Sequence, residues 1–236
     1  MPHEPPITPP PLPMPGDRLD PSVRTLLLFG GSFDPPHKGH VNLPLLAARH
    51  IERLLDEEKG VWVLYIPAAR SPHKSSAPTA TDAQRLEMLN LATSHLPRCA
   101  VWTDEIDRAT AGTPSFTVDT LRRLREWLDG HGGEDVRLRL LIGADQAAAL
   151  ERWREPEAVV ALADPLVMAR DAEGDSPPSQ MPAGLGDWTR RMLPTGKLEA
   201  SSSRVRAALA AGDAASLKRM LDAPIAAFIE REGLYR

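Results

Sequence analysis

Two histidines in a segment rich in glycine and proline form the pattern in this chain best suited to chemistry. Residues 30–40 read Gly-Gly-Ser-Phe-Asp-Pro-Pro-His-Lys-Gly-His and follow a short apolar run. Gly30 and Gly31 let the backbone come close to an anion, and the helix expected at the end of the segment offers N–H groups and a positive dipole end. His37 and His40 can point at the same charge. The segment predicts a phosphate-binding loop; the alternative is a plain strand–turn–helix connection with incidental histidines.

A second anion-binding pattern lies far along the chain, where Ser201 opens the segment Ser-Ser-Ser-Arg-Val-Arg. Hydroxyl and N–H groups at the start of a helix bind phosphate, and Arg206, one turn into that helix, adds a planar cationic group. Taken alone, this pattern is equally typical of a serine helix cap beside a surface arginine.

The two segments together resemble the nucleotidyltransferase superfamily with a histidine-x-glycine-histidine motif, and more narrowly the bacterial nicotinate-nucleotide adenylyltransferases. That family carries a similar Ser-Ser-Thr-x-Ile-Arg motif, in which Ser203 here replaces the threonine. The resemblance implies that Ser202, Ser203 and Arg206 hold the β- and γ-phosphates of ATP. It also implies ATP binding by the first loop, through Gly30, Gly31, Ser32, Phe33, His37 and His40, with the two histidines as catalytic residues.

The family resemblance extends to a loop after the second apolar run. Ser71-Pro72-His73-Lys74 is similar to the family's Pro-Pro-His-Lys, and Arg85 follows Lys74 by eleven residues. The resemblance implies that Lys74 and Arg85 bind the phosphate of a mononucleotide substrate. Without it, a lysine and an arginine are usually solvated surface charges.

The pyridine ring of that substrate is expected to lie between two further segments. Residues 113–121 resemble the family's Pro-Ser-Tyr-Thr-x-Asp-Thr segment, with Phe116 in place of tyrosine, and this implies that Thr117 helps to hold the ring and its carboxylate. A helix cap is the alternative role for Thr117. Trp153 offers a flat face for stacking on the ring, although a helical tryptophan is more often part of a core. Arg154 stands where the family has a tyrosine.

An acid beside a glycine follows the fourth apolar run. Gly143 and Asp145 belong to the segment Ile-Gly-Ala-Asp, eight residues before Trp153. A carboxylate at the end of a strand can accept a hydrogen bond from a ribose hydroxyl. We therefore expect Gly143 and Asp145 to contribute to the ATP site.

Short apolar runs alternate with helical patterns from residue 24 onward, which is typical of an α/β protein with a Rossmann-like, doubly wound parallel sheet. Ligands bind such sheets at the carboxyl ends of the strands, where the first loop would lie. The expected strands are 25–29, 61–66, 100–102, 137–142 and 165–169, and the expected helices are 41–58, 81–94, 116–129 and 144–162. Two or three further helices form a small C-terminal extension over about residues 200–236.

Composition sets the domain boundaries. Residues 1–22 are dominated by proline and are expected to be a disordered leader, since they cannot bury enough apolar surface to order themselves. The remaining 23–236 form one nucleotidyltransferase domain, a size that the 236-residue length allows. Within it, residues 171–187 are rich in glycine, proline and serine and read as a mobile surface loop.

The overall charge and the cysteine count exclude several classes of protein. A net charge of −4 gives no electrostatic footprint for nucleic acid. One cysteine suits a reducing cytoplasm, and no apolar run reaches the length of a membrane span. His37 and His40 lack an evident third ligand, so no protein-bound metal is expected. The sequence is compatible with a homo-oligomer and does not determine the oligomeric state.

The resemblance implies adenylyl transfer from ATP to nicotinate mononucleotide, giving deamido-NAD and pyrophosphate in NAD biosynthesis. His40 would lie nearest the α-phosphate, and Mg²⁺, the expected cofactor, would accompany ATP and bridge phosphates and water. Nicotinamide mononucleotide and phosphopantetheine are alternative acceptors of the same class. A non-catalytic nucleotide-binding regulator is the alternative of a different class.

Overall fold

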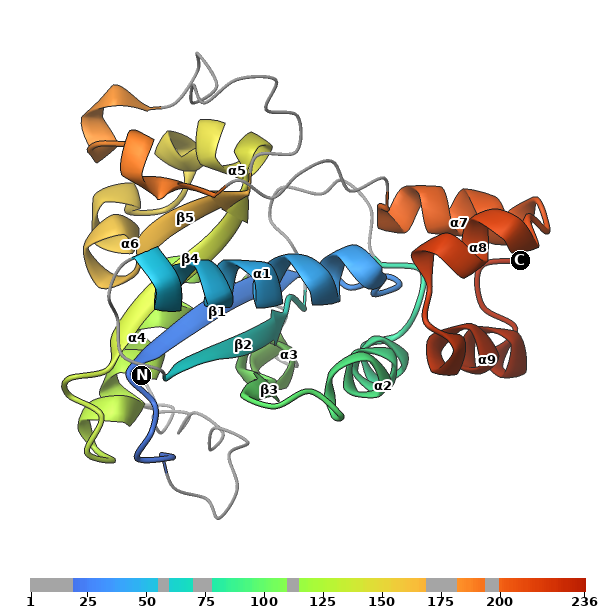
Figure 1. Cartoon of the computed structure of the whole chain (residues 1–236), viewed down its shortest axis with the longest axis horizontal. Helices are drawn as coiled ribbons and strands as arrows, with labels where there is room; N and C mark the ends of the chain where they lie inside the picture. Colours follow the sequence, from blue (N-terminus) through green and yellow to red (C-terminus); the bar gives the residue numbers. More distant parts are fainter. Residues whose placement is uncertain (1–18, 55–59, 70–77, 110–114, 169–181, 194–199) are drawn as a thin grey trace, which may run out of the picture.

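Six parallel strands form the centre of the structure, a computed structural model that describes residues 19–54, 60–69, 78–109, 115–168, 182–193 and 200–236 (Figure 1). The strand order is β3-β2-β1-β4-β5-β6. The chain therefore builds outward from β1 in one direction and then returns to build outward from β4 in the other. Ligands bind such sheets in the crevice where the order reverses. Here that point lies between the ends of β1 and β4. The strand bounds are β1 Thr25–Gly31, β2 Val61–Pro67, β3 Cys99–Val101, β4 Arg137–Gly143, β5 Asp164–Met168 and β6 Met192–Leu193.

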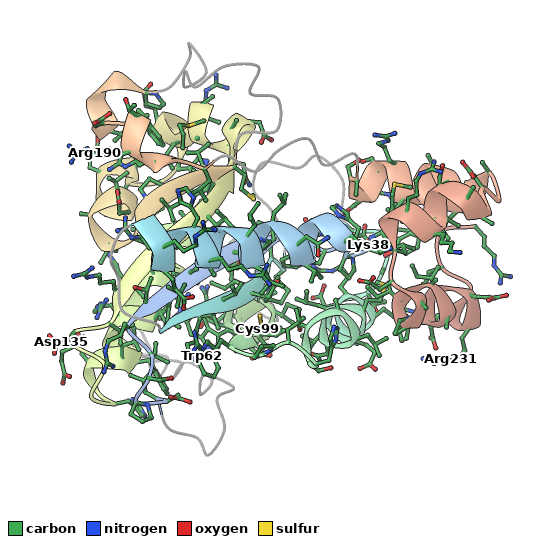
Figure 2. All side chains as sticks on the ribbon, viewed as in Figure 1. Lys38, Trp62, Cys99, Asp135, Arg190 and Arg231 are labelled. Atoms are coloured by element: carbon green, nitrogen blue, oxygen red, sulfur yellow. The ribbon has the colours of Figure 1, made fainter. Side chains whose placement is uncertain are left out.

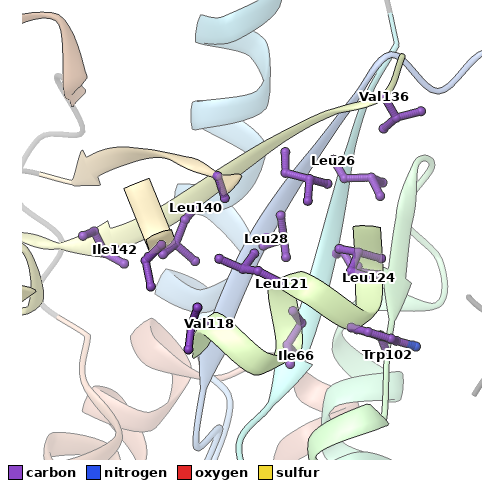
Figure 3. Packing of buried hydrophobic residues seen from close by; sticks show 14 of the residues in the cluster. Leu26, Leu28, Ile66, Trp102, Val118, Leu121, Leu124, Val136, Leu140 and Ile142 are labelled. Atoms are coloured by element: carbon purple, nitrogen blue, oxygen red, sulfur yellow. The ribbon is translucent and has the colours of Figure 1, made fainter. Parts of the chain in front are cut away.

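The alternation of side chains along β1 explains why helices cover both faces of the sheet. Leu26 and Leu28 pack on one face with α4, Thr117–Asp129, through Leu121 and Leu124 (Figure 3). Leu27 and Phe29 point to the opposite face, where α1, Lys38–Leu54, covers them. All four β1 side chains are buried, as expected of a parallel strand with helices on both faces.

Three helices at the C-terminal end pack against α2, Asp82–Thr93, beside the first turn of α1 (Figure 1). Their apolar faces form a separate cluster with α2, in which Met88 meets Ile225 and Phe228. The Lys38 ammonium donates to the carbonyl of Lys218 at 2.9 Å, and Figure 2 shows Lys38 at this junction. The extension is thus fastened to the start of α1, which follows the histidine-containing loop. Its helices are α7 Ser202–Ala210, α8 Ala214–Met220 and α9 Ala223–Glu232.

The expected fold class is confirmed, but several element bounds were wrong. The helix expected over 144–162 is broken into α5, Ala144–Ala148, a 3₁₀ turn, Leu150–Arg152, and α6, Pro156–Leu162. Pro156 explains the break before α6, because proline disfavours helical backbone in the preceding residue. Glu155 is accordingly left-handed, with φ of 50°.

Other differences are small. The first helix begins at Lys38 rather than residue 41, and its expected end beyond residue 54 lies outside the described residues. Strand β3 begins one residue earlier than expected and β1 runs two residues further. The sequence patterns missed the two-residue β6 and the short helix α3, Asp104–Arg108.

The two segments expected to be unstructured are only partly described. Residues 1–18 and 169–181 lie outside the described residues. The described end of the leader, however, packs on the domain, since the Leu19 side chain contacts the core and lies close to Gly133. In the expected surface loop, Ala183–Leu185 form a 3₁₀ turn whose Leu185 is buried. Residues 19–22 of the expected leader and residues 182–187 of the expected loop therefore belong to the described structure.

Candidate active site

A cavity of about 210 Å³ opens at the carboxyl edge of the sheet, between the ends of β1 and β4. One wall comes from the loop after β1, another from the first turn of α4, and a third from the turn before α6. Five of the residues singled out from the sequence line it: Gly30, Gly31, Ser32, Thr117 and Trp153.

The loop after β1 is held from below by aromatic packing. Phe33 has a φ of 47° and is 1 % exposed, so its ring is buried beneath the loop. A side chain at Gly31 would come within 3.1 Å of that ring, which explains the glycine. The Phe33 ring packs edge-on against His40, with centroids 5.0 Å apart. Packing of this kind fixes the plane of the His40 ring.

His37 and His40 form a stacked pair, with ring centroids 3.8 Å apart and planes 27° from parallel. The backbone N–H of Gly39 donates to Nδ1 of His37 at 3.0 Å. The N–H of His37 donates to Nδ1 of His40 at 3.2 Å. Because both Nδ1 atoms accept, each neutral ring carries its proton on Nε2. An Nε2–H group of this kind is a donor suited to phosphate oxygens.

The C-terminal motif lies directly against this loop. Ser201 caps α7 by accepting a hydrogen bond from the N–H of Arg204, as expected for a serine before a helix. The Ser202 hydroxyl donates to the carbonyl of Pro35 at 2.9 Å. Arg206 donates to the carbonyl of Asp34 at 2.6 Å, and a weaker contact of 3.4 Å joins it to the Ser203 hydroxyl. The two motifs predicted to bind anions, distant in sequence, thus contact each other directly.

The side chain of Asp34 joins three parts of the chain and was not singled out as a site residue. It is 6 % exposed and accepts hydrogen bonds from the backbone N–H groups of Thr79 and Ala80, at 2.8 and 3.1 Å. The hydroxyl of Tyr235 donates to the same carboxylate at 2.7 Å. Burial, with the neighbouring Asp34 carboxylate, raises the pKa of Tyr235 well above its ordinary value, so the hydroxyl keeps the proton that it donates.

Arg85 lies beneath the loop. Its side chain is fully buried and donates to the carbonyl of Ser32 at 2.6 Å and to Asp82 at 2.7 Å. In this position Arg85 supports the backbone of Ser32, and a phosphate contact would require the guanidinium to leave these partners. Lys74, the other residue expected to bind the mononucleotide phosphate, lies outside the described residues.

Phe116 and Arg154, two positions at which the chain departs from the family pattern, both line the cavity and contact each other. The guanidinium of Arg154 lies 4.9 Å from the centre of the Phe116 ring, a cation–π contact. Arg154 is also bonded to Asp119 at 3.4 Å. Both lie next to the expected substrate residues, since Thr117 begins α4 and Trp153 precedes Arg154. The pairing was not evident from the sequence, because 38 positions separate the two residues.

Gly143 and Asp145 lie at the end of β4, on the far side of the crevice. A Cβ atom at Gly143 would come within 2.6 Å of the Asp145 carboxylate, so the glycine is required for that carboxylate to fold back over the strand end. The N–H of Gly143 donates to the Gln146 side chain at 3.2 Å. This geometry keeps the Asp145 carboxylate at the C-terminal end of β4, as predicted from the sequence.

A carboxyl group that the sequence did not single out also lines the cavity. Glu105, on α3, accepts a hydrogen bond from the hydroxyl of Thr120 at 3.0 Å. Burial raises the pKa of Glu105 from 4.5 to about 7, against the lowering effects of Thr120, Arg108 and Arg123. No motif marked it, because α3 is only five residues long.

This fold, with a histidine pair at the first strand end and a serine–arginine motif against it, defines a nucleotidyltransferase of the Rossmann-like α/β class. A family model described as Cytidylyltransferase-like matches residues 28–208, most of the chain. Within that class the chain belongs to the nicotinate-nucleotide adenylyltransferase family.

Two relatives show the extent of the similarity; each is named "Probable nicotinate-nucleotide adenylyltransferase". That of Chromobacterium violaceum is 36% identical over 224 residues, covering 89% of this chain and 97% of the relative. That of Stenotrophomonas maltophilia is 35% identical over 234 residues, covering 89% and 96%.

Solved structures share the fold. The nicotinic acid mononucleotide adenylyltransferase of Plasmodium falciparum complexed with NaAD has a TM-score of 0.62 at 15% identity, covering 90% of this chain and 97% of that one. The same enzyme complexed with APC has a TM-score of 0.60. Within the part of the chain that the structure describes, no helix is long and apolar enough to cross a membrane.

Proposed function

We propose that the protein transfers the adenylyl group of ATP to the 5′-phosphate of nicotinate mononucleotide. A phosphate oxygen of the mononucleotide attacks the α-phosphorus of ATP in line, the bond from that phosphorus to the β-phosphate oxygen breaks, and pyrophosphate leaves. The products are deamido-NAD and pyrophosphate. Because the substrate supplies the nucleophile, the protein's part is to position the two reactants and to stabilise the charge that develops between them.

The observation that carries this proposal is the histidine pair beside a cavity walled by aromatic side chains. Nδ1 of each histidine accepts a backbone N–H, so each neutral ring carries its proton on Nε2, a donor suited to the α-phosphate and the leaving group. The start of α7 and Arg206 lie against the same loop and suit the β- and γ-phosphates. Trp153 and Thr117 line the adjoining cavity and suit the pyridine ring.

Magnesium enters this proposal as part of the ATP complex. The described residues contain no group of three or more His, Cys, Asp or Glu side chains that could hold a metal ion by themselves. The donors at the loop are N–H groups, which suit phosphate oxygens rather than a cation. We therefore assign Mg²⁺ to the triphosphate and its water, with charge neutralisation as its contribution.

Pyrophosphate release tests the proposal directly. The protein is incubated with Mg²⁺-ATP and, in separate reactions, nicotinate mononucleotide, nicotinamide mononucleotide, phosphopantetheine or no acceptor. The proposal expects the highest kcat/KM with nicotinate mononucleotide and deamido-NAD as the product. Release with all acceptors absent, or a higher kcat/KM with phosphopantetheine, would contradict it.

A further inference from the structure

The acid at the bottom of the cavity is unexplained by the adenylyl transfer itself. Glu105 is the only acidic residue among the described residues that line the cavity, and two aromatic side chains, Phe116 and Trp153, line the same space. Aromatic faces and a carboxylate together attract a flat organic cation. Arg152 and Arg154 also line the cavity and supply positive charge to it. The cavity therefore offers groups suited to both a positive and a negative part of one ligand.

Charged groups on two helices surround Glu105, which lines the cavity. On its own helix, Asp104 is fully buried and bonds Arg108 at 3.1 Å. From α4, Arg123 donates to both Asp104 oxygens, at 3.0 and 2.7 Å. Both guanidinium groups bond Asp104 and also donate to the Thr120 hydroxyl, at 3.3 and 3.4 Å. That hydroxyl in turn donates to Glu105.

The proposed substrate carries a cation of this shape. In nicotinate mononucleotide the ring nitrogen is bonded to the ribose carbon, so the ring is a pyridinium with a permanent positive charge. Its carboxylate is negative and lies on the same ring. When the ring is reduced to the 1,4-dihydro form, the positive charge disappears, whereas the phosphate, ribose and carboxylate remain.

We propose that Glu105 is a specificity-determining residue that binds the positive charge of the pyridinium ring and selects the oxidised over the reduced mononucleotide. The inference rests on the proposed function. The ionised carboxylate attracts the pyridinium, and the low polarity of the cavity strengthens that attraction. The reduced ring, being uncharged, gains nothing from the carboxylate.

Binding of the oxidised mononucleotide should be accompanied by release of a proton from Glu105. Burial raises the pKa of Glu105 in the ligand-free protein to about 7, so this carboxyl is partly protonated near pH 7. A bound pyridinium favours the ionised form and lowers the pKa. Binding of the oxidised mononucleotide therefore releases a proton near and below pH 7, and binding of the reduced form does not.

The test compares the two ring forms in wild type, E105Q and E151Q. The last variant removes an exposed acid from the 3₁₀ turn before Trp153 and serves as the matched control. The measurement is the ratio of kcat/KM for the oxidised mononucleotide to that for the reduced one. We expect E105Q to lower this ratio by about tenfold or more, and E151Q to leave it within about twofold. A folded E105Q with an unchanged ratio overturns the inference.

A second measurement needs no variant. Calorimetric titration of wild type with each ring form, in two buffers of different ionisation enthalpy at pH 6.5, gives the number of protons released. The phosphate titrates identically in both ligands, so the difference reports Glu105. Equal proton release for the two forms overturns the inference even if E105Q does not fold. If wild type fails to adenylate the oxidised mononucleotide at all, the proposed function fails first.

Discussion

Removing one hydroxyl group, by Tyr235→Phe, should destabilise the fold and also loosen the loop between β1 and α1 (the nucleotide loop). The hydroxyl donates to Asp34 at 2.7 Å, and both side chains are buried, at 8 % and 6 % exposed. A buried hydrogen bond to a charged group contributes about 1.5–3 kcal/mol. For a domain of this size each kcal/mol corresponds to about 2–4 °C in Tm, so we expect Tyr235→Phe to lower Tm by about 3–12 °C. The ring and its packing remain.

The loss should also be visible in catalysis, because Asp34 belongs to the loop that carries His37 and His40. Without the hydroxyl, the Asp34 carboxylate keeps the N–H groups of Thr79 and Ala80 but is less firmly held. We expect kcat/KM for ATP to fall by about three- to tenfold, since small displacements of a positioned group are costly. The assay is pyrophosphate release at varied ATP, with KM for the mononucleotide as the internal reference.

The chain's other tyrosine provides the matched control. The hydroxyl of Tyr65 is buried and has no hydrogen-bond partner among the described residues. Tyr65→Phe removes a buried, unsatisfied polar group, which is neutral or stabilising. The two variants make the same chemical change, but Tyr235→Phe should lower Tm, whereas Tyr65→Phe should leave Tm unchanged or raise it. Equal losses of stability in both, or a Tyr235→Phe protein with unchanged Tm and ATP kinetics, would refute the reasoning.

Four further outcomes are expected. His40→Ala should lower kcat by about 10²–10³-fold, as for loss of one preorganised donor; near-normal kcat would reassign the mechanism. E105Q should have a higher Tm than wild type at pH 8 but not at pH 5. The pKa of Glu105 is about 7 in the folded protein and 4.5 ordinarily. The free energy of unfolding of wild type therefore falls by about 1–3 kcal/mol as the pH rises through this window. Wild type should have a higher kcat/KM with nicotinate mononucleotide than with nicotinamide mononucleotide. Thr117→Val should reduce the ratio of these two kcat/KM values, because the Thr117 hydroxyl is expected to bind the carboxylate of the acid. Deleting residues 1–18 should leave kcat unchanged; a folded truncation with a large loss of kcat would assign the leader a role.

Local patterns account for what the sequence predicted well. The sheet follows from short apolar runs, each bounded by turn residues, and the Ser201 cap follows from a preference that acts within one helical turn. The broken helix over 144–162 was missed although its signal was present: Pro156 makes a continuous helix through residue 155 unfavourable. The two-residue β6 was missed because so short a strand is stabilised by pairing with β5 and not by its own sequence.

The missing parts of the site are contacts between distant residues. The hydrogen bond from Tyr235 to Asp34 joins positions 201 apart, and nothing in either local pattern indicates the other. The burial of Arg85 beneath Ser32 depends on how α2 packs against β1. Glu105 reaches the cavity because α3, which follows β3 in the chain, packs against β2, the neighbour of β1. Residue types therefore suggest which groups bind phosphate, which stays a prediction, and only packing determines which groups hold them in place.

The contacts at Asp34 also decide how the C-terminal helices should be regarded. Residues 200–236 supply three hydrogen bonds to the nucleotide loop, from Ser202 to Pro35, from Arg206 to the Asp34 carbonyl and from Tyr235 to the Asp34 carboxylate. Arg206 also forms an ion pair with that carboxylate at 3.8 Å. Each donor satisfies an acceptor that is buried or half-buried in the loop, and leaving such an acceptor unpaired is costly. The helices α7–α9 are therefore part of the catalytic domain rather than an appendage, and the loop depends on them for the position of its two histidines.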